Sequence, residues 1–213
     1  MKFYTVVGSP NCRKVQAVIN HLGLAVENEY LEFFAGELRT PAQLGINPNG
    51  MVPALVDGAL KLWESNAIMQ YLADKAGDDA LFPRDPSRRY DVARWQFWEV
   101  AHFNKAFGVI AFEMVAKPGF GLGATNVALV DAMKEDLQRF AAVLEGHLTG
   151  HTYMVGSGIT LADYAMIHLE GFKEAIPFDW TPYPKLNAYF DRMCSVEAWA
   201  RTAAHNRSID LGK

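Results

Sequence analysis

Strand-like patterns are confined to the first third of the chain, and this asymmetry constrains the fold more than any other feature. Runs of β-branched and aromatic residues bounded by turn residues are typical of strands. They lie at residues 2–7, 26–31 (the weakest run), 53–56 and 59–62. Asp57-Gly58 separates the last two runs and predicts a tight hairpin between them. Beyond residue 86 every pattern is helical, so the sequence predicts a mixed α/β domain followed by an all-α domain.

Helix signals alternate with the strands in the first domain. Ser9-Pro10 is an N-cap residue followed by proline at the first helical position, and Thr40-Pro41 repeats this signal. A third helix is expected from Ser65 to Lys75. The resulting order is β-α-β-α-β-β-α, so we expect parallel pairing of the early strands and antiparallel pairing in the hairpin.

A polar, proline-bearing linker separates the two predicted domains. We place the first domain at residues 1–76, the linker at 77–86 and the helical domain at 87–213. The helical domain is expected to open with a helix over residues 87–116, which Lys117-Pro118-Gly119 breaks. Further helices are predicted from apolar positions spaced by three and four residues, at 130–148, 161–175, 185–194 and around Ala198.

Composition and charge argue against several classes of protein. The 213 residues carry a net charge of −4 and no basic stripe, so a nucleic-acid partner is not expected. No apolar run reaches membrane-spanning length, the N-terminus is strand-like rather than a signal peptide, and the two cysteines make no disulfide framework. We therefore expect a soluble cytoplasmic protein. The histidines show no metal-ligand spacing, so no metal site is expected.

The segment from Asn47 to Pro53 and the pair Glu64-Ser65 predict a binding site for a small peptide. An X-Pro bond takes the cis form far more readily than other peptide bonds. A cis Val52–Pro53 bond would turn the main-chain groups of Val52 outward, where an extended peptide pairs with them. Glu64-Ser65 opens a helix whose N-terminus favours a carboxylate, while the Glu64 side chain suits an ammonium group. Glutathione offers both a peptide backbone and an amino-acid head group.

Thr160 and Asp163 have the spacing of a capping box at the start of a helix. In this motif the N-cap residue and an acidic residue three positions later bond reciprocally, and Ile159 stands where the hydrophobic staple belongs. The expected role is structural, and loss of such a cap costs roughly 1 kcal/mol or more.

Four segments together resemble the cytosolic glutathione transferases over nearly the whole chain. They are Ser9 to Val15, Asn47 to Pro53, Glu64 to Ile68 and Ser157 to Asp163. The Ser-x-x-Cys-Arg pattern of the first segment is most similar to the serine-type theta and delta groups and their bacterial relatives. The resemblance implies a thioredoxin-like N-terminal domain joined to an all-helical domain. It also implies a homodimer, in which the helix after Glu64 packs against the long helix of the partner subunit.

The resemblance further implies that Ser9 stabilises the glutathione thiolate. A hydroxyl donor at a helix N-terminus lowers the pKa of a nearby thiol, so serine would act as a donor and not as a nucleophile. From its position alone, Ser9 is only an N-cap residue. Asn11 lies in the same turn and is an alternative donor, and Cys12 is an alternative thiol. A small buried residue is the favoured interpretation of Cys12.

The glycyl end of glutathione is the least clear part of the predicted site. The expected glutathione contacts are Val52, Pro53, Glu64 and Ser65, with Arg39 as a candidate for the glycyl end. Many relatives carry polar residues facing the glycyl carboxylate where this chain has Leu38 and Met51. We expect either Arg39 or a group of the partner subunit to replace those contacts.

The second substrate is expected between the two domains. The helix over residues 87–116 is rich in aromatic residues, and His102, Phe103 and Phe107 are the candidates for lining an acceptor pocket. For each of them taken singly, a place in the core is the favoured interpretation.

The function implied by the resemblance is conjugation of glutathione to a hydrophobic electrophile, a detoxification reaction. Two alternatives remain. One is a glutathione-dependent peroxidase or disulfide reductase on the same fold, in which Asn11 or Cys12 matters more than Ser9. The other is a non-catalytic glutathione-transferase-like binding module, which Leu38 and Met51 suggest.

Overall fold

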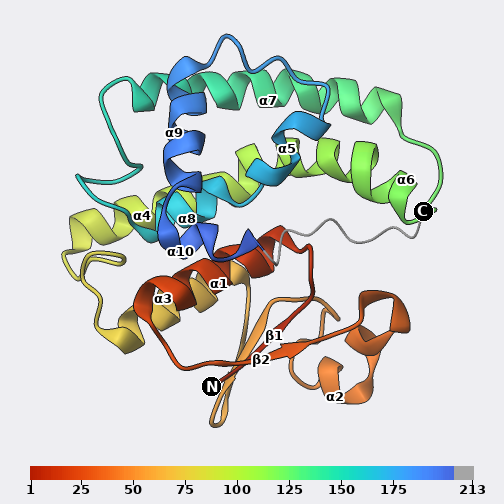
Figure 1. The fold of residues 1–213 in the computed structure, drawn as a ribbon, viewed down its shortest axis with the longest axis vertical. Coiled ribbons are helices and arrows are strands. Elements are labelled where there is room, and N and C mark those ends of the chain that lie inside the picture. The colour runs from red at the N-terminus through yellow and green to blue at the C-terminus, as the bar shows by residue number, and fades with distance from the viewer. Residues whose placement is uncertain (204–213) are drawn as a thin grey trace. The chain divides into compact units, whose positions relative to one another are not determined.

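The computed structural model describes residues 1–203, and the chain divides into two compact units (Figure 1). The first unit comprises Met1–Phe82 together with the segment that begins at Val196. The second unit comprises Pro83–Ser195. The division between Phe82 and Pro83 falls inside the polar segment interpreted as a linker.

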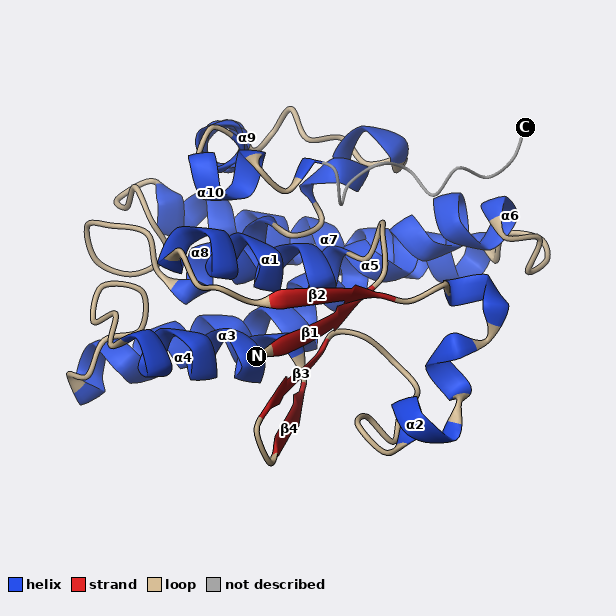
Figure 2. Ribbon diagram, turned by 60° about the horizontal axis from the view of Figure 1, so that its bottom comes forward, coloured by secondary structure: helices blue, strands red, loops and turns tan. Residues whose placement is uncertain are grey.

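A four-stranded sheet with the order β2-β1-β3-β4 organises the first unit. β1 (Lys2–Thr5) runs parallel to β2 (Glu27–Tyr30) and antiparallel to β3 (Ala54–Asp57). β3 pairs in turn with β4 (Leu60–Trp63) as an antiparallel hairpin, and Figure 2 shows these strands in red. Gly58 in the hairpin turn has a φ of 59°, a left-handed conformation that glycine adopts without steric cost. The parallel pair and the hairpin predicted from the sequence are confirmed.

Three helices of the first unit follow the predicted start signals. α1 (Pro10–Leu22) begins at the N-cap Ser9 and α2 (Pro41–Leu44) at the N-cap Thr40, each with proline in its first turn, and α3 is Ser65–Ala76. α1 and α3 pack against each other. Their inward faces and the sheet form one apolar core, in which several side chains are completely buried, among them Phe3, Val15, Val18, Leu55, Ile68 and Leu72. Two short 3₁₀ helices, Phe33–Ala35 and Glu37–Arg39, are too short to produce a periodic pattern in the sequence.

α10 (Glu197–Ala200) belongs to the first unit, whereas the sequence-based boundaries placed it in the helical domain. It packs on α1, and Trp199 is 1% exposed. A helix of four residues needs a neighbouring surface to bury its apolar side chains. The sequence of α10 does not specify whether that surface belongs to the first or to the second unit.

A long helical run opens the second unit. It comprises α4 (Pro86–Trp98), α5 (Asn104–Ala111) and α6 (Lys117–Gly119), joined by π-helical turns at Glu99–Phe103 and Phe112–Ala116. The break predicted at Lys117-Pro118-Gly119 is confirmed to within one turn, because the helical run ends at Gly119, directly after Pro118. The run ends where Phe120 N–H donates to Ala116 O at 2.8 Å and Gly121 takes a φ of 65°.

The remaining helices of the second unit are α7 (Val127–Leu148), α8 (Leu161–Ile167) and α9 (Pro184–Cys194). The helix predicted over 161–175 is instead α8 followed by a 3₁₀ segment, Glu170–Ala175. α7 packs on α5 and α9 around a core that includes Ile110, Leu137, Leu144 and Tyr189. Within residues 1–203, no helix combines the length and the apolar character needed to span a bilayer.

The predicted capping box at the start of α8 is present and is larger than the motif requires. The Asp163 carboxylate accepts hydrogen bonds from the N–H and the hydroxyl of Thr160, at 2.8 and 3.0 Å. It also accepts from Met154 N–H at 2.9 Å and from Tyr189 Oη at 3.1 Å. Burial raises the pKa of Asp163, although these four hydrogen bonds act in the opposite direction. One carboxylate thereby joins α8 to α9 and to the loop before α8.

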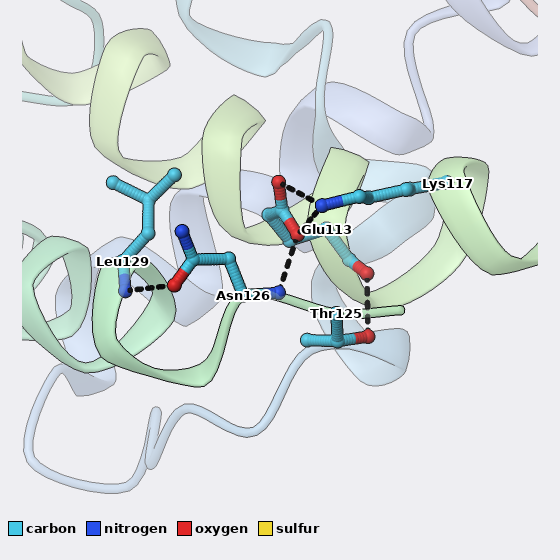
Figure 3. Close-up of polar contacts among 5 residues, drawn as sticks. All are labelled: Glu113, Lys117, Thr125, Asn126 and Leu129. Atoms are coloured by element: carbon cyan, nitrogen blue, oxygen red, sulfur yellow. Dashed lines mark hydrogen bonds and ion pairs between the residues drawn. The ribbon is translucent and has the colours of Figure 1, made fainter. Parts of the chain in front are cut away.

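Glu113 ties the loop after α6 to the long helical run (Figure 3). Its carboxylate accepts hydrogen bonds from Asn126 N–H at 2.7 Å and from Lys117 Nζ at 2.8 Å. Its carbonyl oxygen accepts from Thr125 Oγ1 at 2.9 Å. Asn126 is also the N-cap of α7, since its side chain accepts from Leu129 N–H at 3.1 Å. The start of α7 is therefore held in place by a carboxylate of the preceding helical run.

We expect Glu113→Gln to lower the melting temperature near neutral pH, and the difference from wild type to disappear in acid. The hydrogen bond from Asn126, and then Lys117, lower the pKa of Glu113 below its ordinary value of 4.5. A lowered pKa in the folded state stabilises the protein above the unfolded-state pKa, and this contribution is lost as the pH falls through the folded-state pKa. Melting curves of both proteins across this range measure the effect.

The control for this prediction is Asp136→Asn, which removes a solvent-exposed ion pair with Arg139, 2.7 Å long. Exposed pairs contribute little to stability, so this variant should melt with wild type at every pH. If the melting temperature of Glu113→Gln stays below that of wild type by the same amount from neutral to acidic pH, the stabilisation does not come from the Glu113 charge.

Candidate functional site

Ser9 lies at the junction of β1 and α1, where the sequence predicts an N-cap. Its φ and ψ are −79° and 116°, an extended conformation, and its Oγ accepts a hydrogen bond from Cys12 N–H at 3.3 Å. The capping role is confirmed. A serine hydroxyl that accepts one bond still has a proton to donate, and the N-terminus of α1 adds a positive potential that favours an anion. The cap geometry is therefore compatible with a second role as a donor to a sulfur anion.

Cys12 is completely buried in the first turn of α1. Burial raises the pKa of its thiol above the ordinary 9.0. Reactive cysteines are exposed and have lowered pKa values. The geometry thus agrees with the interpretation of Cys12 as a small core residue.

The N-termini of α1 and α3 are joined by Asn11 and Ser65, which are 54 residues apart in the chain. Ser65 Oγ donates to Asn11 Oδ1 at 3.2 Å, which brings the start of α3 beside the start of α1. Ser65 is 7% exposed, whereas Asn11 is half-buried. The sequence nominated both residues but did not predict their contact, because nothing local links them. Two helix N-termini side by side provide two sets of main-chain donors for anionic groups.

Glu64, the residue before α3, has an unusual backbone. Its φ and ψ are 73° and 113°, and it is the one residue other than glycine with a positive φ within the described residues 1–203. Such conformations cost of order 1–3 kcal/mol and concentrate at functional sites. The Glu64 side chain is exposed, so its carboxylate is accessible to a ligand at the start of α3.

The Val52–Pro53 peptide bond is cis, as the sequence suggested. The loop before it is shaped by Asn47, which is 5% exposed. Its Nδ2 donates to Met51 O at 2.8 Å, and its Oδ1 accepts from Asn49 N–H at 3.1 Å and from Asn49 Nδ2 at 2.9 Å. The sequence predicts a turn here but does not reveal that the Asn47 side chain organises it. The signal that the sequence offered was an asparagine at the start of a turn segment.

The residues next to the expected glycyl end differ in their surroundings. Leu38 is 7% exposed and belongs to the core, so the structure does not present it to a ligand. Met51 is 65% exposed. Arg39 is exposed at the end of the second 3₁₀ helix, and its Cγ lies 3.5 Å from where a Cβ on Gly50 would stand. Arg39 therefore lies along the loop that carries Val52 and supplies a cation there.

The three acceptor-pocket candidates occupy different environments in the second unit. His102 is exposed, whereas Phe103 and Phe107 are 1% and 0% exposed. The Phe103 ring stacks on Trp98 with centroids 6.2 Å apart, and Phe107 meets Phe103 edge-on at 5.9 Å. Both phenylalanines are packed as core residues of this unit. Their role in acceptor binding stays a prediction, as does that of His102.

Within the described part of the chain, no cluster of three or more histidine, cysteine or acidic side chains is arranged to hold a metal ion. The candidate residues in the first unit are hydroxyl, amide, carboxylate and guanidinium groups. They are suited to bind an anionic peptide by hydrogen bonds and charge, with no chemistry of their own beyond donation.

Comparison with known proteins gives consistent matches along the chain. The family model "Glutathione S-transferase, N-terminal domain" matches residues 1–74, and "Glutathione S-transferase, C-terminal domain" matches residues 105–197. Glutathione S-transferase 3 of Zea mays is 31% identical over 210 residues, 96% of this chain and 93% of that protein. A glutathione S-transferase of Hyoscyamus muticus is 31% identical over 213 residues, 97% of this chain and 99% of that protein.

Among solved structures, glutathione S-transferase I from mais in complex with an atrazine glutathione conjugate is similar in fold. It superimposes with a TM-score of 0.88 at 28% sequence identity, covering 98% of both chains. The similarity therefore extends across both units.

Proposed function

The chain belongs to the glutathione S-transferase family and is a glutathione transferase, and we propose that Ser9 supplies the hydrogen bond that stabilises the glutathione thiolate. The observation that carries this proposal is the meeting of two helix N-termini through Asn11 and Ser65, with Ser9 at the start of one of them. A ligand bound at the start of α3 would extend toward the start of α1.

Glutathione would be held by its ends and by its backbone. The γ-glutamyl carboxylate would accept hydrogen bonds from the first main-chain N–H groups of α3 and from Ser65 Oγ, whose single proton would turn from Asn11 Oδ1 to the ligand. The ammonium group would pair with Glu64. The cysteinyl main chain would pair with Val52, whose N–H and C=O make no hydrogen bond within residues 1–203. Arg39 would face the glycyl carboxylate. This arrangement leaves the sulfur to reach the Ser9 hydroxyl.

The reaction then needs only a stabilised thiolate and an electrophile. The thiol loses its proton to solvent, and its anion is held by the Ser9 hydroxyl and the α1 N-terminus. Lowering a thiol pKa from about 8.5 to about 6.5 takes ~2.7 kcal/mol and ionises most of the thiol at neutral pH. The thiolate attacks an electrophilic carbon of the acceptor, a carbon–sulfur bond forms, and the leaving group departs with its bonding electrons.

The acceptor is proposed to be a small hydrophobic electrophile, with His102 among its contacts. Support comes from the enzyme from mais, which was solved with a conjugate of glutathione and atrazine. A role in detoxification in the cytoplasm follows from this chemistry as a proposal.

The homodimer is also proposed: Tyr90 and Phe97 on α4 are 72% and 75% exposed, as expected for side chains that a second copy covers. Sedimentation equilibrium measures the mass of the protein in solution, which should be twice that of one chain.

The subgroup is a separate proposal. The Ser-x-x-Cys-Arg segment favours a serine-type enzyme, and the theta- or delta-like bacterial placement rests on that segment alone. The relatives at 31% identity are plant enzymes, and they support the family without supporting that placement.

Binding and thiolate formation test the function directly. The protein should be retained on immobilised glutathione, and addition of glutathione should produce ultraviolet thiolate absorbance below the pH at which free glutathione ionises. Retention without the thiolate signal would favour the binding module. A redox activity lost in Cys12→Ala would favour the reductase, which the buried, raised-pKa thiol of Cys12 argues against.

We expect Ser65→Ala to raise the KM for glutathione about tenfold while kcat changes little. A hydrogen bond to a charged group contributes roughly 1.5–3 kcal/mol, and an interaction made equally in the ground and transition states affects KM alone. Initial-rate kinetics at varied glutathione separate the two constants. The matched control is Ser87→Ala, at the exposed start of α4, which should change neither. If the KM for glutathione is unaltered in Ser65→Ala, the proposed binding of the γ-glutamyl end at the start of α3 is wrong.

A further inference from the structure

α10 holds α1 at two points, and one of them is a turn away from Ser9. Arg13 is 5% exposed, its Nε donates to Thr202 Oγ1 at 2.8 Å, and its guanidinium carbon lies 4.0 Å from the centroid of the Trp199 ring. Two turns further along the same face, Asn20 Nδ2 donates to Ala198 O at 3.1 Å. We call these contacts the α10 clamp.

The α10 clamp is buried and has hydrogen bonds of its own. Thr202 is completely buried, and its hydroxyl donates to Trp199 O at 2.6 Å while accepting from Arg13. A planar guanidinium that stacks on an indole and donates through Nε is fixed in position and in plane. This contact is therefore a geometric constraint on the helix turn that carries Arg13, in addition to a source of stability.

Arg13 also closes the turn that begins at Ser9. Its main-chain N–H donates to Ser9 O at 3.0 Å, the first helical hydrogen bond of α1. The same turn is held on another side by Asn11, which accepts from Ser65 Oγ at 3.2 Å. The main chain of Ser9 is thus hydrogen-bonded to Arg13, whose side chain contacts Trp199 and Thr202.

We propose that Arg13 is a positioning residue of the reaction: through its contacts with Trp199 and Thr202 it sets where the Ser9 hydroxyl points, and the C-terminal segment of this unit thereby takes part in thiolate stabilisation. The inference rests on the proposed role of Ser9. No sequence pattern indicates it, because Arg13 and Thr202 are 189 residues apart.

The test compares two ends of the clamp. In Arg13→Met, turnover at saturating glutathione should fall about tenfold, because small displacements of a reacting group cost this much or more. The acidic limb of its pH profile, which reports the thiol of bound glutathione, should move to higher pH by about one unit. Asn20→Ala, about 16 Å from Ser9 along α1, is the matched control and should lower the melting temperature without moving that limb.

Further variants separate geometry from charge and from folding. Arg13→Lys keeps the charge without the planar stack, so its profile should stay shifted; a wild-type profile in this variant would overturn positioning in favour of a simple charge effect. Trp199→Phe keeps the core filled and weakens the stack, and it should shift the profile in the same direction by less. If Arg13→Met does not fold, the pH profile of Trp199→Phe tests the positioning role of Arg13 in its place.

The Ser9→Ala background distinguishes failure of this inference from failure of the proposed function. If Arg13 acts through Ser9, Ser9→Ala/Arg13→Met has the same pH profile as Ser9→Ala, although it melts lower. If Ser9→Ala itself leaves the profile unchanged, the proposed role of Ser9 fails and this inference with it. If Ser9→Ala shifts the profile and neither Arg13→Met nor Trp199→Phe does, only the positioning role is overturned.

Discussion

Ser9→Ala should lower kcat about a hundredfold and leave the KM for glutathione nearly unchanged. Removal of one donor to a developing or stabilised anion costs about 10²–10³ in kcat at comparable sites. The loss falls on kcat because the thiolate is stabilised after glutathione has bound through other residues. At pH values above the pKa of free glutathione the deficit should narrow, since the thiol then ionises without help. Kinetics and ultraviolet titration of the bound thiol measure both effects.

The structure makes a matched control available for Ser9→Ala, because Ser9 is also a helix cap. Thr40 caps α2 in the same unit by accepting from Gln43 N–H at 3.3 Å, the same distance as between Ser9 Oγ and Cys12 N. Thr40→Ala therefore loses an equivalent cap, worth about 1 kcal/mol, and should retain full turnover. Ser9→Thr keeps the hydroxyl and should retain most of it. Unchanged turnover in Ser9→Ala would move the donor role to Asn11.

Asp163→Ala should destabilise the protein by at least about 3 kcal/mol, a large share of the roughly 5–15 kcal/mol that stabilises a typical domain. The substitution removes the shared acceptor of four hydrogen bonds, from Thr160 twice, Met154 and Tyr189. Each buried donor left without a partner costs about 1–3 kcal/mol. Urea denaturation monitored by fluorescence gives the difference in free energy of unfolding.

The control for Asp163 is a cap of the same residue type at the surface. Asp85 is exposed and accepts from Arg88 N–H at 3.0 Å at the start of α4. Asp85→Ala should lower the stability much less, because water replaces the lost bond. Equal losses in the two variants would mean that burial and the extra partners of Asp163 add nothing to a simple cap.

Local signals in the sequence predict a large part of this fold. The caps at Ser9, Thr40 and Thr160, the Asp57-Gly58 hairpin and the cis Val52–Pro53 bond are all present. The caps and the hairpin depend on residues within about four positions of one another, so short-range sterics and hydrogen bonding suffice to specify them. The end of the long helical run at Gly119, directly after Pro118, is a further feature of this kind. The local sequence permits the cis bond but does not specify it.

The candidate site was predicted as a set of residues and not as an arrangement. Ser9, Asn11 and Ser65 were all nominated from the sequence, but the bond between Asn11 and Ser65 appears only when α1 packs on α3. Leu38 stands where many relatives carry a polar residue, and it is buried in the core. Asn47 was missed, because its importance lies in the buried bonds of its side chain and not in its turn propensity.

By itself, the sequence determined the division into a mixed-sheet part and a helical part, the starts of the main helices and the residue types available for binding a peptide thiol. Those features follow from the periodicity and turn chemistry of neighbouring residues. Tertiary structure alone decided that α10 packs on α1, that Arg13 grips Thr202, and that the N-termini of α1 and α3 meet. The physical reason is that an apolar face can be buried against any complementary face, and packing of the whole chain selects which one.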